Sequence, residues 1–176
     1  VIWAMVDRIN DVYVMYEMVR EGTIQQLASY VKATEQYFGW NVVKRLIDPN
    51  FGRKPLLGTG LSVIDELWKY KVSFAEADDN KEGGHLKVKE RLHYDPKRPL
   101  DINNKPKIFF VKFRTDRTFR SLQHYQFDEW KGHLDKDPKE DTVAKDAHGA
   151  DTVRYLFASN PSYEQPQIYE PQGAFY

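Results

Sequence analysis

Three acidic side chains and one histidine stand at places in the sequence where the backbone would expose them. Asp48 follows a short apolar run and precedes a proline, which ends the expected strand and leaves Asp48 at its tip. Asp146 and Asp151 fall at the start of a helix expected over 146–157, with His148 between them. Carboxylates in such positions suit divalent cations, because Mg²⁺ and Mn²⁺ prefer oxygen ligands.

The spacing within the last helix indicates which of these residues can act together. His148 and Asp151 are three positions apart and share a helix face, whereas Asp146 is five positions from Asp151, about 140° around the axis. If that face packs against the strand tip, Asp48 and Asp151 can hold metal ions for cleavage of a phosphodiester. A structural interpretation stays open, because Asp before Pro is a common turn residue and Asp near a helix start is a common cap.

The chain has 26 basic and 26 acidic residues, but they are unevenly distributed. Residues 81–120 include 12 Lys or Arg and five Asp or Glu, a local charge of +7, whereas residues 128–151 include eight acids and four Lys, a local charge of −4. A basic region beside an acidic metal site suits phosphodiester cleavage, because it attracts the nucleic acid backbone. The residues expected to contact DNA phosphates are Lys87, Lys89, Arg91, Lys112, Arg114 and Arg117. The alternative is that they only solvate an outer face.

Several function classes are disfavoured by what the sequence lacks. There is no cysteine, which excludes disulfides, zinc knuckles, iron–sulfur clusters and thiol nucleophiles and makes a reducing compartment the expected location. There is no GxxxxGK[ST] loop, so we do not expect ATP hydrolysis, and no GxSxG, HExxH or calcium-loop motif. The apolar runs are short, so neither a membrane span nor a signal peptide is expected.

Strands and helices that could position these residues alternate along the chain. The pattern predicts a β-hairpin over 1–16, a helix over 23–39, a strand over 42–47, a loop over 51–60, a helix over 62–70, a strand over 72–74, a helix over 85–93, an exposed connection over 94–106, a strand over 107–113, a helix over 116–130, a loop over 132–145 and a helix over 146–157. This order predicts an α/β domain over 1–158 with a mixed central β-sheet flanked by α-helices. Residues 159–176 are expected to form an extended tail.

Five segments, taken in order, carry a resemblance to a known family. They are LIDPN at 46–50, GHLKVKERL at 84–92, PKIFFV at 106–111, RTFRSLQHYQFD at 117–128 and DAHGADTVRY at 146–155. The most specific piece is the His-x-x-Asp-x-x-Arg-Tyr ending, which follows a strand-tip Asp. In this order the segments resemble the C-terminal nuclease domain of the large terminase subunit of tailed bacteriophages.

The resemblance implies a ribonuclease H-like fold and a metal-dependent endonuclease that cuts concatemeric double-stranded DNA with two Mg²⁺ or Mn²⁺ ions. Asp48 resembles the second acidic ligand of that family and Asp151 the third, with His148 beside it and Asp146 as a partial substitute for a missing ligand. The family's first acidic ligand would lie on a strand before Val1, so the chain is expected to be a fragment whose first strand lies upstream.

The same resemblance implies partners and a location. The partners would be double-stranded DNA, an N-terminal packaging ATPase domain outside this chain, the portal protein and the small terminase subunit, with no membrane. The protein would act in the host cell cytoplasm and would be absent from the mature virion, and its tail would dock to the portal or procapsid. Two alternatives remain: a non-catalytic DNA-binding or portal-docking module, and another ribonuclease H-like nuclease such as a resolvase or transposase.

Overall fold

Strands and helices alternate along the chain in the computed structural model, which describes residues 1–131 and 148–165. The described elements are β1 (Ile2–Val6), β2 (Val12–Glu17), α1 (Ile24–Phe38), β3 (Leu46–Ile47), α2 (Pro49–Gly52), α3 (Val63–Lys69), β4 (Ala75–Glu76), α4 (Lys81–Leu92), β5 (Ile108–Phe110), α5 (Asp116–Lys131) and α6 (His148–Ala158). The protein is therefore a mixed α/β protein, as the sequence predicts.

The larger sheet has three strands in the order β1-β2-β5. The strands β1 and β2 form the predicted antiparallel hairpin, in which Ala4 pairs with Val14 and the register shifts between Trp3 and Ala4. The strand β5 pairs with β2 in parallel, with Ile108 opposite Val12, so the sheet is mixed. The strands β3 and β4 form a separate parallel pair.

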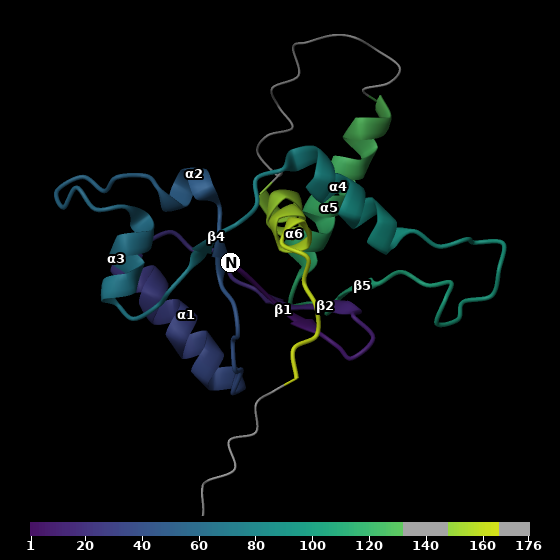
Figure 1. Ribbon diagram of the computed structural model, residues 1–176, viewed down its shortest axis with the longest axis horizontal. Helices are drawn as coiled ribbons and strands as arrows, with labels where there is room; N and C mark the ends of the chain where they lie inside the picture. Colours follow the sequence, from purple (N-terminus) through teal and green to yellow (C-terminus); the bar gives the residue numbers. More distant parts are fainter. Residues whose placement is uncertain (132–147, 166–176) are drawn as a thin grey trace, which may run out of the picture.

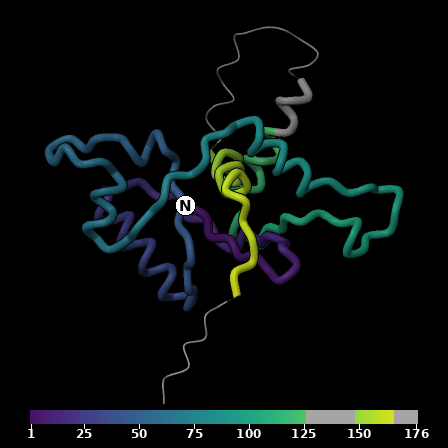
Figure 2. Tube along the Cα trace, viewed as in Figure 1, coloured from purple at the N-terminus to yellow at the C-terminus, as the bar shows by residue number. Residues whose placement is uncertain are grey.

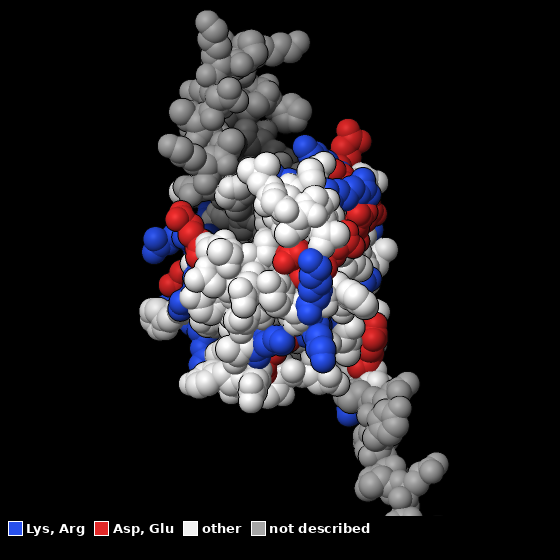
Figure 3. All heavy atoms as spheres, turned by 90° about the vertical axis from the view of Figure 1, so that its left-hand side faces the viewer, with Lys and Arg blue, Asp and Glu red and all other residues white. Residues whose placement is uncertain are grey.

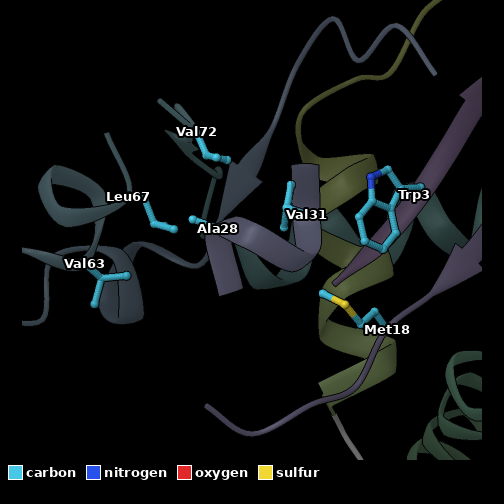
Figure 4. Packing of buried hydrophobic residues seen from close by; sticks show 7 residues of the cluster. All are labelled: Trp3, Met18, Ala28, Val31, Val63, Leu67 and Val72. Carbon is cyan, nitrogen blue, oxygen red and sulfur yellow. The ribbon is translucent and has the colours of Figure 1, made fainter. Parts of the chain in front are cut away.

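Helices lie on both sides of the hairpin, and each group builds its own part of the core. In Figure 1, α1 and α3 lie to one side with β3 and β4, while α4, α5 and α6 gather over the other end of the molecule. The first cluster comprises Trp3, Met18, Ala28, Val31, Val63, Leu67 and Val72. Figure 4 shows Ala28 and Val31 of α1 between Leu67 on one side and Trp3 on the other.

The second cluster packs the last three helices onto the sheet. Its buried members are Val12, Val88, Ile108, Leu122, Ala150, Val153 and Phe157. The helix α6 contacts both α4 and α5, so it is the central helix of this group. Gly149 makes the contact with α5 close, because an added Cβ there would lie 2.8 Å from the Ser121 Cβ.

Five elements differ from the sequence prediction. The strand predicted over 107–113 is reduced to β5, which pairs with β2 only at residues 108–110, and the loop predicted over 51–60 begins inside α2. The strand predicted over 42–47 is reduced to β3, because β4 pairs only with Leu46 and Ile47. The next strand is β4 rather than 72–74, because the Val72 N–H donates to the Leu67 carbonyl and ends α3. The helix α4 begins four residues before the predicted start, because the Asn80 side chain accepts from the Gly83 N–H and caps it.

Two long connections extend away from the packed elements, one around residues 53–61 and the other around 93–107 (Figure 2). The predicted loop over 132–145 and the first two residues of the predicted last helix lie outside the described residues. Residues 159–165 of the predicted tail have no regular secondary structure, and the Tyr163 N–H donates to Asn10 Oδ1 at 2.8 Å. The rest of the tail lies outside the described residues. Within residues 1–131 and 148–165, no helix is both long and apolar enough to cross a membrane.

Candidate functional site

Asp48 lies at the end of β3, as the sequence predicts, and its carboxylate begins the short helix α2. Its Oδ1 atom accepts a hydrogen bond from the Asn50 N–H at 2.8 Å. Its negative charge also acts on Tyr155 of α6, where it raises the pKa of the phenol. The charge at the tip of β3 therefore acts on a residue of α6.

Arg154 lies at the centre of this site. Its side chain is 1% exposed, and its Nε donates to Asp151 Oδ1 at 3.2 Å while its Nη2 donates to Asp79 Oδ1 at 3.4 Å. The Asp151 and Asp79 side chains are 40% and 42% exposed, so the guanidinium lies beneath two partly open carboxylates. Its Nη1 is buried and has no hydrogen-bond partner within the described residues.

The charge on Arg154 is maintained by these contacts. Burial by itself lowers the pKa of a guanidinium, but the hydrogen bonds to Asp151 and Tyr155 and their charges raise the pKa of Arg154 above its ordinary value. Gly84 of α4 makes room for the side chain, because a Cβ there would lie 2.6 Å from the Arg154 Cγ. A buried cation thus holds acidic residues of two separate segments near one another, Asp79 before α4 and Asp151 on α6.

Tyr155 completes the site. Its hydroxyl donates to Asp79 Oδ1 at 3.3 Å, and the Arg154 Cζ lies 4.2 Å from the centre of its ring. Burial, together with the charges of Asp48 and Asp79 and against the opposing effect of Arg154, raises the pKa of Tyr155 to about 12. The phenol therefore remains a hydrogen-bond donor at neutral pH.

Asp79 is the site residue that the sequence reasoning missed. It lies in the polar segment before α4, and the sequence around it does not indicate which residues its side chain contacts. Its contacts are to Arg154 and Tyr155, which are more than 70 positions away in the chain. The only local signal was that Asp78 and Asp79 stand together just before a helix.

The other predicted site residues have different positions. His148 is the first described residue of α6 and is exposed, and its carbonyl accepts from Thr152 Oγ1 at 2.6 Å. The structure shows no hydrogen bond of the His148 side chain within the described part of the chain. Asp146 lies outside the described residues.

The predicted DNA-binding residues divide into two groups. Lys87 Nζ donates to the Ala158 carbonyl at 3.1 Å, and Arg91 Nη1 donates to the Asn10 carbonyl at 2.7 Å, so both tie α4 to other elements. Lys89 lies exposed on α4. Lys112, Arg114 and Arg117 are exposed between β5 and the first turn of α5.

The acidic residues can be tested against the chemistry of a divalent ion. Within residues 1–131 and 148–165, no three His, Cys, Asp or Glu side chains gather as a ready-made set of metal ligands. Mg²⁺, however, is usually held by one or two carboxylates together with water and substrate phosphates. Asp48 and Asp151 each use Oδ1 in the hydrogen bonds above, and they offer the oxygen donors that such an ion prefers.

No protein-family model, curated protein or solved structure matches this chain.

Proposed function

We propose that this chain is a divalent-metal-dependent endonuclease domain that cuts double-stranded DNA, of the ribonuclease H-like type found in large terminase subunits. The observation that carries the proposal is the convergence of Asp79 and Asp151 on the Arg154–Tyr155 pair, together with the effect of the Asp48 charge on Tyr155. These carboxylates come from three segments of the chain, and two of them are partly exposed.

Each residue has a role in this proposal. Asp48 and Asp151 would bind the metal, and Arg154 holds Asp151 and Asp79 while offsetting their mutual repulsion. Tyr155 orients Asp79 through its hydroxyl. A divalent ion bound there would supply an activated water and would offset charge on the leaving oxygen.

Exposed basic residues support the choice of DNA as the substrate. Lys112, Arg114 and Arg117 lie on the surface, and within the described residues no ion pair engages them. Such side chains bind phosphates without reading sequence. In this proposal the domain would work beside a packaging ATPase domain, the small terminase subunit and a portal protein in the cytoplasm of the host.

One observation favours a second candidate, a DNA-binding or portal-docking module without catalysis. Arg154 already neutralises part of the acidic group, so the carboxylates are stable in the absence of a metal ion. The two candidates differ in what they need, because a docking module binds its partner with or without a divalent ion.

Cleavage of supercoiled plasmid DNA separates these candidates. The chain would be incubated with plasmid in Mn²⁺, in Mg²⁺ and in chelator, beside Asp48→Asn and Asp151→Asn. Asparagine is as good a helix cap as aspartate, so Asp48→Asn should preserve the start of α2. We expect metal-dependent cleavage that both variants abolish, and a loss of about 10- to 100-fold for Asp79→Asn, which removes an orienting partner.

Asp95→Asn is the matched control. Asp95 is half-buried like Asp48, and its Oδ1 accepts from the N–H two positions ahead at 2.9 Å, as Asp48 Oδ1 does at 2.8 Å. This variant should cut like the parent chain. DNA binding without any cleavage by the parent would overturn the nuclease proposal and support the docking module.

A further inference from the structure

An aromatic and basic surface lies where the end of α1 meets the turn after β5, and none of its residues belongs to the acidic site. We call it the aromatic platform; it comprises Tyr37, Phe38, Trp40, Lys112, Phe113 and Arg114. The rings of Phe38 and Trp40 stack with centres 4.3 Å apart and planes 13° apart, and Tyr37 meets Phe38 edge-on at 4.9 Å. The Arg114 Cζ lies 5.4 Å from the centre of the Phe38 ring.

Two rings of the platform contribute little to the core. Tyr37 and Phe113 are each 82% exposed. Phe113 also has a φ of 65°, in the left-handed region that a bulky residue rarely adopts. An exposed aromatic side chain on a strained backbone is costly to the fold, and such positions cluster at binding sites.

The charge around these rings is available to an anion. Lys112 Nζ lies 4.9 Å from the centre of the Phe113 ring, so a cation lies beside the exposed Phe113 as well as beside Phe38. The nearby acids are already engaged, because Asp116 Oδ1 accepts from the Phe113 N–H at 2.9 Å and Glu17 accepts from the N–H groups that begin α5. The side of the molecule formed by α1, α2 and α3 has a broad uncharged area, with Lys and Arg and some Asp and Glu side chains in and around it (Figure 3).

Exposed rings beside cations match one kind of ligand. Unpaired bases stack on aromatic side chains and on Arg guanidinium planes, while Lys and Arg meet the phosphates between them. A base-paired duplex offers only its backbone to such a surface, because its bases are already stacked on one another. We propose that the aromatic platform binds unpaired nucleotides of a nucleic acid strand.

Fluorescence anisotropy with labelled oligonucleotides in chelator tests the platform without any cleavage. The probes are a single-stranded oligothymidine, an abasic strand of the same length and charge, and a duplex. We expect the oligothymidine to bind about 5-fold or more tightly than the abasic strand, because one stacked base contributes at least that much. Equal affinity for the two strands would overturn the proposal, because it would assign all binding to phosphates.

Two substitutions locate the binding. Phe113→Asn removes the ring and suits the left-handed backbone, so it should keep or raise the melting temperature while removing most of the preference for bases. Tyr37→Ser should weaken binding of oligothymidine and leave the abasic strand unchanged. Trp68→Ala is the control, because Trp68 is 71% exposed on α3 and outside the platform.

The outcomes are independent of the nuclease proposal. Asp151→Asn should bind oligothymidine like the parent chain, whether or not the parent cuts plasmid. Loss of the base preference in Trp68→Ala, or its retention in Phe113→Asn, would refute the platform. Absence of any binding to single strands at low salt would also refute it and would indicate a protein partner for these rings.

Discussion

At the scale of single residues, Arg154 has the strongest structural constraints in the candidate site. A buried guanidinium is tolerated only where partners compensate for the lost water, and Asp151 and Asp79 provide them at 3.2 and 3.4 Å. The space for the side chain depends on Gly84, which a larger residue would fill. The site is therefore built around a positive charge, and the acidic residues are held by it.

Tyr155 gives this site a measurable pH dependence. Burial raises the pKa of Tyr155 from 10.0 to about 12, so the folded chain holds the phenolic proton more tightly than the unfolded chain does. The stabilisation from this proton is complete below pH 10.0 and is lost as the pH rises through about 12. Tyr155→Phe should remove this part of the alkaline loss.

Urea unfolding of the parent and Tyr155→Phe from neutral pH to pH 12 measures the difference. The free energy of unfolding of the parent should fall more steeply than that of the variant above pH 10.0. Parallel curves would contradict the assignment of a raised pKa to Tyr155.

At the scale of elements, the close contact between α5 and α6 positions the start of α6. A Cβ at Gly149 would lie 2.8 Å from the Ser121 Cβ and 2.9 Å from the Thr118 Cα. The Ala150 N–H donates to Ser121 Oγ at 3.0 Å across the same contact. Because Asp151 follows directly, the separation of the two helices sets the position of its carboxylate.

Gly149→Ala should destabilise the protein, although alanine is the better helix former by about 1 kcal/mol. The added methyl group has no space, and forced packing of this kind costs about 1–3 kcal/mol. Urea denaturation measures the change. Ser29→Ala, on an exposed position of α1, is the control and should have little effect. A Gly149→Ala protein as stable as the parent would show that the two helices can separate freely.

At the scale of the whole molecule, the hairpin joins the two parts of the core. Trp3 of β1 belongs to the cluster with α1 and α3, and Val12 of β2 belongs to the cluster with α4, α5 and α6. The two strands are hydrogen-bonded along their length. Unfolding of one cluster would therefore separate the strands and disturb the other cluster. We expect one cooperative unfolding transition.

Val31→Ala and Val153→Ala test this expectation, because each removes a fully buried side chain from a different cluster. Each substitution should lower the free energy of unfolding by about 2 kcal/mol. Tryptophan fluorescence and circular dichroism should report the same midpoint for each protein. Two separated transitions, each sensitive to one substitution, would contradict a single cooperative unit.

Features that depend on near neighbours in the chain were predictable from the sequence. Thr23 caps α1 and Gly39 ends it with a φ of 66°, as the residue types and their spacing indicate. The hairpin follows from two apolar runs around a polar turn. Asp48 lies at a strand end because Pro49 follows it. Each of these outcomes is decided within a few residues by backbone geometry, capping or alternation.

The tertiary structure alone decided which distant residues meet. The sequence determined the α/β class, the hairpin, the main helices and the position of Asp48 at a strand end. It did not indicate that Asp79 would reach Arg154, that Arg114 would lie over Phe38, or that β3 would be only two residues long. These features depend on pairings and packing between segments far apart in the chain. No local periodicity encodes such contacts, because they arise only when the helices and strands share one core.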